Sequence, residues 1–204
     1  SVFLQGATSA YTLLLLDGVP LNDPTGVGGT FDIRLLPLEN VERIEILKGS
    51  QSTLYGSNAV AGVINIISKK SQAAKPQRNG LITYGSYNSF KANANISQKI
   101  KWLQYNLNYV HDRTDGISEA KDTTGSSGFD KDGFTQNAIQ AIVGFNLSNH
   151  LKISPYYRVT KFKGDYDADA CIDAPNHDKG SLQNTGVTGH YNYRNGSVQF
   201  NYGY

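Results

Sequence analysis

The sequence predicts a mixed fold: a partial α/β domain over residues 1–70, then antiparallel β-strands of an incomplete transmembrane β-barrel over residues 80–204. Three observations support this prediction. The first part has Leu-rich and β-branched runs separated by tight turn signals, whereas the second is rich in Tyr, Asn, Gln, Ser and Gly. The second part also repeats an alternation of apolar and polar side chains. Its connections are alternately short and long. Residues 71–79 are basic, contain a proline and are typical of a linker.

The composition argues against several classes of protein. Charged residues make up 18% of the chain, below the roughly 25% of ordinary soluble domains. The net charge of +2 argues against a nucleic-acid partner. A single cysteine excludes an internal disulfide framework, and no apolar run approaches the ~20 residues of a membrane helix. No Ser-His-Asp, Cys-His or paired-carboxylate arrangement stands out, so we do not expect an enzyme.

Residues 1–70 are expected to form a small mixed sheet. Asp17-Gly18 is a turn dipeptide, and Gly56 suits the end of a helical turn. The expected elements are a buried strand over Tyr11–Asp17, an extended run over Val19–Leu21, a loop over Asn22–Thr30, a turn or short helix over Leu38–Val41, a strand over Arg43–Lys48, a helical turn over Ser52–Tyr55 and a strand over Val60–Ser68. We expect Gly49, Gly56 and Gly62 at positive φ or in close backbone contact.

Residues 80–204 show the period-2 pattern of β-strands. Leu103–Tyr109, for example, alternates Leu and Tyr with Gln and Asn. The apolar faces are aromatic-rich and the polar faces mostly uncharged, which favours a transmembrane barrel with a polar lumen. The alternative is a soluble β-sandwich with one wet face. The expected tight turns are Gln98-Lys99, Asn149-His150 and Asn195-Gly196, and the expected long loops are Thr114–Asp132 and Gly164–Ser181.

Residues 3–70 resemble the plug domain of TonB-dependent outer-membrane receptors. The resemblance is carried by LLLLDGVPLNDP, which contains Asp17-Gly18-Val19-Pro20-Leu21, and by LPLENVERIEILKGSQSTLYGSNAVAGVINIISKK. It implies a plug lodged inside a barrel like the 22-stranded plugged transporters. The chain would then supply the later part of the plug and about seven strands. Lys48-Gly49, with barrel motifs such as Tyr84-Gly85-Ser86-Tyr87-Asn88, favours the branch of vitamin B12 and siderophore receptors.

The resemblance also implies a function and a location. The intact protein would reside in the outer membrane of a Gram-negative bacterium and import a scarce, bulky nutrient when TonB pulls on the plug. Vitamin B12 is the first candidate nutrient and a ferric siderophore the second. The expected partners are TonB, through a segment missing here, outer-membrane lipid and the nutrient, but no nucleic acid. A non-transporting β-sandwich interaction domain on the cell surface is the alternative from another class.

The resemblance places the plug exit near Lys70 at the periplasmic side, which predicts a hairpin. A single strand over Leu81–Ser97 would leave the long loop Thr114–Asp132 in the periplasm, against the usual short-inside, long-outside order. A tight turn near Gly85–Asn88 restores that order. We therefore predict strands over Leu81–Gly85 and Tyr87–Gln98. Five more are expected over Ile100–Asp112, Gly133–Leu147, Leu151–Lys163, Leu182–Arg194 and Ser197–Tyr204.

Two groups of plug residues are candidates for contacts with other parts of the assembly. The loop Asn22–Asp32 lies at the plug tip in the family and would face incoming ligand. Its expected substrate-binding residues are Asn22, Asp23 and Asp32. Arg43, Glu42 and Glu45 are expected to form ion pairs that hold the plug in the barrel; the alternative is an ordinary exposed strand, where ion pairs contribute only about 0–1 kcal/mol.

Acidic residues in the two long loops are the candidate metal ligands. An EF-hand is rejected, because Ala170 and Asn176 stand where that motif needs Gly and Glu. Cobalamin receptors gather calcium from Asp and Tyr oxygens on neighbouring extracellular loops. The set that matches by position is Asp115, Asp130, Asp132, Tyr166, Asp167 and Asp178. The alternative is a pair of solvated, charged surface loops, and no cofactor other than Ca²⁺ is expected.

Overall fold

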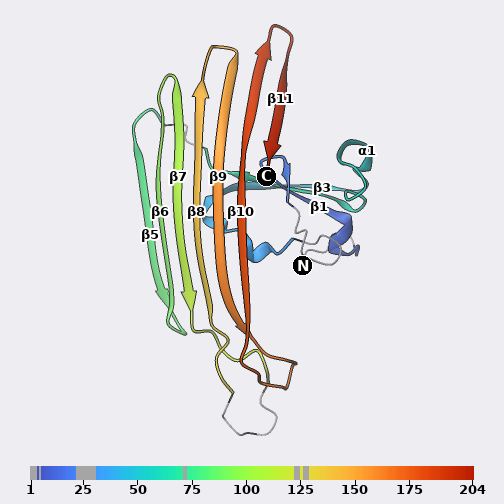
Figure 1. The fold of residues 1–204 in the computed structure, drawn as a ribbon, viewed down its shortest axis with the longest axis vertical. Helices are drawn as coiled ribbons and strands as arrows, with labels where there is room; N and C mark the ends of the chain where they lie inside the picture. Colours follow the sequence, from blue (N-terminus) through green and yellow to red (C-terminus); the bar gives the residue numbers. More distant parts are fainter. Residues whose placement is uncertain (1–3, 5, 22–30, 71–72, 122–124, 126–128) are drawn as a thin grey trace.

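The chain forms two sheets that lie against each other (Figure 1). The computed structural model describes residues 4, 6–21, 31–70, 73–121, 125 and 129–204. The smaller sheet has four strands in the order β2-β1-β4-β3, and the larger has seven in the order β11-β10-β9-β8-β7-β6-β5. Among the described residues, no helix has the length and apolar character needed to span a membrane.

The small sheet is mixed, as predicted. β1 (Thr12–Leu16) pairs in parallel with β4 (Gly62–Ser68) and antiparallel with β2 (Val19–Pro20), while β3 (Val41–Lys48) pairs antiparallel with β4. The short helical elements are η1 (Ser9–Tyr11), η3 (Ile33–Leu35), η4 (Leu38–Asn40) and α1 (Ser52–Tyr55). β1 carries four consecutive leucines because both its faces are buried, one against Val63 and the other against Ile66.

The three glycines singled out in the sequence have backbone conformations that disfavour side chains. Gly49, Gly56 and Gly62 have φ angles of 87°, 85° and 152°, which confirms the expectation of positive φ. At Gly62 the backbone of Leu47 also approaches so closely that a Cβ would collide with its carbonyl oxygen.

The large sheet is a continuous antiparallel meander. Its strands are β5 (Gln77–Gly85), β6 (Ser89–Lys99), β7 (Leu103–Thr114), β8 (Phe134–Asn146), β9 (Leu151–Tyr166), β10 (Asn176–Tyr193) and β11 (Gly196–Gly203). The connections β7–β8 and β9–β10 emerge together at one end of the sheet, and the turns β6–β7, β8–β9 and β10–β11 lie at the other (Figure 1). We call these the long-loop end and the short-turn end.

The predicted hairpin at the start of the large sheet is confirmed. β5 and β6 pair from Gly85 opposite Ser89, so the ladder does not run through the turn as one strand. Tyr87 and Asn88 occupy the turn with φ angles of 58° and 53°. Two left-handed residues in succession give the backbone twist that joins right-twisted antiparallel strands tightly.

Several predicted boundaries are wrong by a few residues. The turn after β6 occupies residues 100–102 rather than Gln98-Lys99, and β5 already begins within the stretch expected as a linker. The largest difference is β10, which begins at Asn176 rather than Leu182, so the second long loop is shorter than expected. Its first residues are polar and show no apolar alternation, yet their backbone groups pair with β9 from Asn176 opposite Tyr166 onward.

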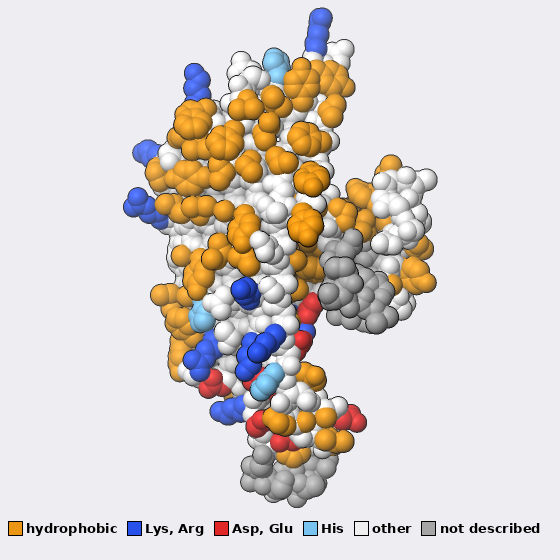
Figure 2. All heavy atoms as spheres, in the orientation of Figure 1, with side chains coloured by type: hydrophobic (Ala, Val, Ile, Leu, Met, Phe, Trp, Pro, Cys, Tyr) orange, Lys and Arg blue, Asp and Glu red, His pale blue; other side chains and the backbone are white. Residues whose placement is uncertain are grey.

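In its middle strands the large sheet buries its polar face and exposes its apolar face, whereas the edge strands β5 and β11 are exposed on both faces. On β7, Asn106 and Asn108 are 4% and 6% exposed, whereas Leu107 and Tyr109 are 42% and 43% exposed. Figure 2 shows apolar side chains spread as a band across the outward face of the sheet. A soluble β-sandwich has the opposite polarity, because it buries the apolar faces of two sheets against each other. The sandwich alternative is therefore wrong, and the small sheet covers the polar face instead.

Candidate ligand-binding site between the two sheets

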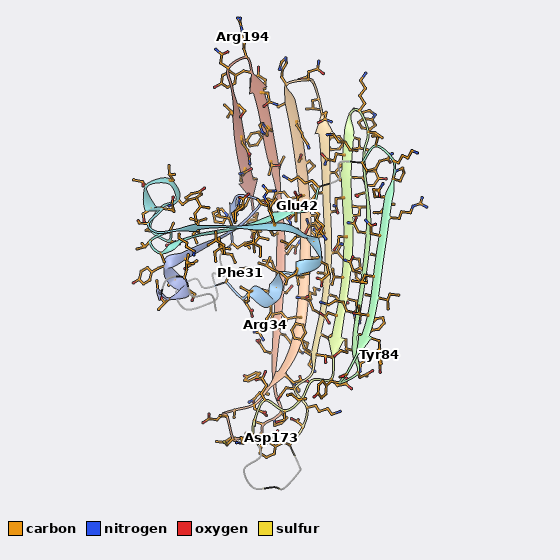
Figure 3. All side chains as sticks on the ribbon, turned by 180° about the vertical axis from the view of Figure 1, so that it is seen from behind. Phe31, Arg34, Glu42, Tyr84, Asp173 and Arg194 are labelled. Atoms are coloured by element: carbon orange, nitrogen blue, oxygen red, sulfur yellow. The ribbon has the colours of Figure 1, made fainter. Side chains whose placement is uncertain are left out.

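The segment around η3 joins the small sheet to the large one. Asp32 begins η3: its carboxylate accepts a hydrogen bond from the Arg34 backbone N–H at 2.9 Å and pairs with the Arg34 guanidinium at 2.7 Å. Arg34 also pairs with Asp178 of β10 at 2.5 Å and lies 4.4 Å from the centre of the Phe162 ring of β9. Gln136 of β8 donates a hydrogen bond to the Arg34 carbonyl. Figure 3 shows Phe31 and Arg34 on the segment between the two sheets.

The charges of this junction stabilise each other. Partial burial alone would raise the pKa of Asp32, but hydrogen bonds from Arg34 and its charge outweigh burial and lower the pKa below the ordinary 3.8. The hydrogen bond from Arg34 to Asp32, together with the charge of Asp178, raises the pKa of Arg34 although burial opposes it. Both groups therefore remain ionised at neutral pH, and the junction is a charged contact.

A cavity of about 660 Å³ opens beside this junction. Its lining includes Phe31 and Asp32 from the small sheet's loops, and the side chains of Phe162 and Asp178 from the large sheet. The volume lies within the range of small-molecule sites, and a few charged groups among apolar walls are typical of them. Asp32 is thus placed on a cavity wall, whereas the other two expected substrate-binding residues, Asn22 and Asp23, lie outside the described residues.

The two long loops bring three carboxylates together at the long-loop end. Asp130, Asp167 and Asp173 each place one carboxylate oxygen within 4.8 Å of the others. Asp167 joins the two loops, because it accepts a hydrogen bond from the backbone N–H of Ala120 at 2.6 Å, and it accepts another within its own loop from Ala174 at 3.1 Å. Figure 3 shows Asp173 at this end of the molecule. This acidic triad has ligand atoms suitable for holding a metal ion.

A fourth carboxyl group, Asp132, interacts with the triad. Burial raises the pKa of Asp132, and the neighbouring charge of Asp167 raises it further, although the Glu119 backbone N–H donates to it at 2.6 Å. Backbone hydrogen bonds from Ala174 and Ala120 lower the pKa of Asp167 against the effect of burial. Asp132 is therefore the group of this pair that holds a proton most readily, and a bound cation would favour its ionised form.

Two other residues of the predicted metal set, Asp115 and Asp178, have partners outside the triad. Asp115 lies beside Arg113 at 3.4 Å and accepts a hydrogen bond from Asn88 at 3.3 Å. Asp178 pairs with Arg34, and Tyr166 ends β9 with 45% exposure. Asp173, which the sequence-based set lacks, completes the triad because its loop folds back next to Asp130.

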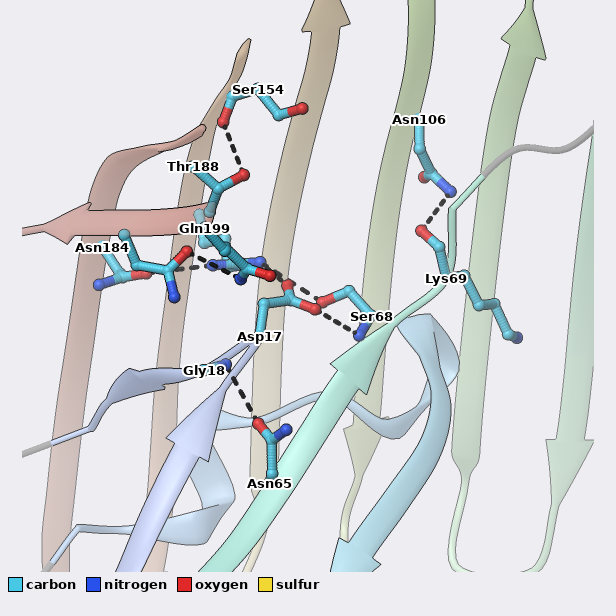
Figure 4. Close-up of polar contacts among 12 residues, drawn as sticks. Asp17, Gly18, Asn65, Ser68, Lys69, Asn106, Ser154, Asn184, Thr188 and Gln199 are labelled. Atoms are coloured by element: carbon cyan, nitrogen blue, oxygen red, sulfur yellow. Dashed lines mark hydrogen bonds and ion pairs between the residues drawn. The ribbon is translucent and has the colours of Figure 1, made fainter. Parts of the chain in front are cut away.

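A buried ion pair forms the second junction between the sheets, and sequence reasoning missed it. Asp17 at the end of β1 pairs with Arg158 of β9; their side chains are 9% and 6% exposed. Asp17 also accepts a hydrogen bond from the Ser68 backbone N–H at 3.0 Å, while Arg158 donates to Asn184 at 3.3 Å. Figure 4 shows Asp17 beside Ser68, with Gly18 donating to Asn65. The end of the parallel pair β1–β4 is thus fixed to the strand wall.

The ion pairs expected from the sequence differ from those in the described part of the chain. Arg43 pairs with Glu42 at 3.3 Å and Glu45 at 2.8 Å, all on β3 and exposed. The pairs that cross between the sheets are instead Arg34–Asp178, Arg158–Asp17 and Lys91–Glu39, the last at 2.7 Å.

A small mixed sheet packed on the polar face of an apolar-surfaced antiparallel sheet is the arrangement of a plug against part of the wall of a transmembrane β-barrel. Residues 1–63 match the TonB-dependent Receptor Plug Domain family. Residues 1–63 are therefore a TonB-dependent receptor plug domain, and the seven antiparallel strands that follow match part of a receptor barrel. Members of this family are transporters rather than enzymes and reside in the Gram-negative outer membrane.

The similar proteins agree with this assignment. The sequence is 31% identical over 178 residues to the vitamin B12 transporter BtuB of Photobacterium profundum; the match covers 85% of this chain and 28% of that protein. Among solved structures, the siderophore receptor PirA from Acinetobacter baumannii gives a TM-score of 0.71 at 20% identity, over 93% of this chain and 31% of that one. The ferric enterobactin receptor PfeA (mutant G324V) from Pseudomonas aeruginosa gives 0.69 at 18% identity, over 93% and 32%. These structural matches show a shared fold.

Proposed function

We propose that the protein containing this chain is an outer-membrane receptor that imports a scarce, bulky nutrient, with vitamin B12 as the first candidate. The observation that carries the proposal is the charged cavity of about 660 Å³ between the plug and the strand wall. The sequence similarity to a vitamin B12 transporter supports the choice of nutrient. The chain spans 28% of the length of that relative, so the proposal concerns the whole receptor.

A ferric siderophore is the second candidate, supported by the structural similarity to siderophore receptors. In either case TonB would act on the plug from the periplasm, and the energy would come from outside this chain. The ion pairs between the sheets, at Arg34, Arg158 and Lys91, are contacts that such a pull would have to strain or break.

Ligand binding by the purified intact receptor tests the proposal. Cyanocobalamin should bind, a ferric siderophore should not, and Asp32→Asn should weaken cobalamin binding by about tenfold, because a charged hydrogen-bonding group in the cavity wall is lost. Glu42→Gln, an equally conservative change on exposed β3, is the control and should bind normally. Siderophore binding without cobalamin binding would favour the second candidate. A protein that fractionates as soluble, or binds neither nutrient, would contradict the proposal.

The proposal includes a Ca²⁺ ion at the long loops. Calcium takes six to eight oxygen ligands at about 2.3–2.6 Å. The triad of Asp130, Asp167 and Asp173 offers three carboxylates, and Asp132 lies beside them. The described geometry supports an ion held by this group, with loop carbonyls and waters completing its shell, more than it supports ligation by Asp115, Tyr166 or Asp178.

Calcium should protect the first long loop, between β7 and β8, from proteolysis. Trypsin cleavage after Lys121 and Lys131 in the intact receptor should slow when Ca²⁺ is added. Asp167→Asn should abolish this protection, whereas Asp169→Asn, on the exposed neighbouring position, should preserve it. Since the pKa of Asp132 is raised, protons compete with the ion, and protection should decline as the pH falls toward that pKa. Equal cleavage with and without Ca²⁺ would contradict the metal site.

A further inference from the structure

A row of cations crosses the outward face of the large sheet near the long-loop end. We propose that these cations bind the phosphate groups of a glycolipid in the outer leaflet of the membrane. The inference rests on the proposed outer-membrane function, which places the outward face in lipid and the long loops outside. The row is centred on Lys161 and Lys163 of β9 and Lys179 of β10, and we call it the cationic row.

The strand register places these lysines side by side. Lys163 lies directly opposite Lys179 in the β9–β10 ladder, and Lys161 lies two residues along β9 on the same face. Tyr157, also on this face, is 41% exposed, whereas the intervening Arg158 and Phe162 are each 5% exposed on the opposite face. The lysines therefore point away from the plug and toward the membrane side of the sheet.

The row lies where the apolar band ends. The outward residues of β9 are apolar over residues 151–159, nine positions along the strand, and a membrane-spanning strand needs about 9–11 residues. Lys161 is the next outward residue. On β8 and β7 the outward face changes from Ile139 and Tyr109 to Asn137 and His111 at the same level of the sheet. Figure 2 shows the cationic side chains gathered beside the apolar band at the long-loop end.

The charges of the row are not balanced within the described part of the chain. Lys161 and Lys179 have no carboxylate partner there, and Lys163 lies only loosely against Asp165, at 3.7 Å. The Asp165 carboxylate also contacts Nδ1 of His177, at 2.6 Å. Like charges placed directly opposite each other in a ladder are destabilising, so the Lys163–Lys179 pair favours an anionic partner.

A shallow pocket continues the row across β7 and β8. Its volume is about 420 Å³, and its walls contain the cations Arg113, Lys131 and Lys163 together with Asp115 and Asp165. With Lys161 and Lys179, five cations face two carboxylates, and Asp115 is already paired with Arg113 at 3.4 Å. Phosphate groups match such a cluster in charge, and the adjoining apolar band suits acyl chains. Both features together fit a phosphorylated lipid rather than free phosphate.

The test uses the intact receptor, purified in mild detergent, with native mass spectrometry to measure bound lipid. Bisphosphorylated lipid A is the probe, and dephosphorylated lipid A and phosphatidylglycerol are the comparison lipids. Lys161→Gln, Lys163→Gln and Lys179→Gln are combined in one variant. Lys75→Gln, Lys101→Gln and Arg194→Gln form the matched control at the short-turn end, where these exposed cations lie. Figure 3 shows Arg194 at that end.

The wild type and the control should retain bisphosphorylated lipid A in preference to both comparison lipids. The triple variant of the cationic row should bind it at least about tenfold more weakly, since each basic residue near an anionic lipid surface contributes appreciably. Equal retention by the row variant, equal loss in the control, or equal binding of either comparison lipid would overturn the inference. Nutrient binding, measured on the same samples, reports separately on the proposed function and on folding of each variant.

Discussion

Replacing Asp17 with Asn in the intact receptor should destabilise the docked plug by about 3–5 kcal/mol, which is the usual cost of removing one partner from a buried ion pair. Asn preserves the size of the side chain, its hydrogen bond from Ser68 and its tolerance for the left-handed backbone, φ 52°. The change therefore isolates the charge. Arg158 would remain 5% exposed without its carboxylate partner. Urea titration followed by proteolysis of the released plug measures the effect.

An exposed ion pair provides the control for this prediction. Arg43→Gln removes the contacts with Glu42 and Glu45, but exposed pairs contribute only about 0–1 kcal/mol, so plug stability should hardly change. Adding Arg158→Met to Asp17→Asn should recover part of the loss, because no buried charge then remains unpaired. An Asp17→Asn variant as stable as Arg43→Gln would show that the pair does not fix the plug.

Local features of the fold could be predicted from the sequence because short-range physics determines them. The helical turn Ser52–Tyr55 was predicted to the residue, since Gly56 ends it at positive φ. The hairpin at Tyr87 followed from the family resemblance, which places the plug exit at the periplasmic side, together with the short-inside, long-outside order of connections. The start of β10 could not be predicted, because Asn176 and the residues after it pair through their backbones and carry no apolar pattern. The alternation of apolar and polar residues indicates which face of a strand is buried, and not which backbone groups form hydrogen bonds.

The sequence predicted the kind of site, an acidic cluster, but not all of the residues that form it. An excess of Asp in two long loops indicated a shared acidic cluster, and the structure brings Asp130 and Asp167 together. Loop conformation decides that Asp173 joins them, while Asp178 pairs with Arg34 from a segment 144 residues away in the sequence. The Asp17–Arg158 contact spans 141 residues. In the sequence, Asp17 is explained as part of a turn dipeptide and Arg158 as a polar-face residue of a strand. Neither explanation indicates that the two side chains pair.

The glycine at the start of β4 should be among the least replaceable residues of the plug. Gly62→Ala has to adopt a φ of 152°, for which strain costs about 1–3 kcal/mol. Its new Cβ would also collide with the Leu47 carbonyl oxygen of β3 and meet a side-chain carbon of Leu4 at 2.6 Å. Overpacking of this kind costs about another 1–3 kcal/mol. The backbone oxygen cannot move away without disturbing the β3–β4 ladder, which ends with Lys48 opposite Gly62.

Gly49→Ala is the matched control, because Gly49 has a φ of 87° and no described atom lies within 4 Å of the position that a Cβ would occupy there. Gly49→Ala should lower the free energy of plug unfolding by the cost of backbone strain alone, about 1–3 kcal/mol. The free energy of plug unfolding should therefore fall further for Gly62→Ala than for Gly49→Ala, by about the overpacking cost. Equal losses would mean that β3 and β4 separate easily at this end. The edge of the plug sheet would then deform easily, and the close approach of Leu47 would not help to fix the β3–β4 register.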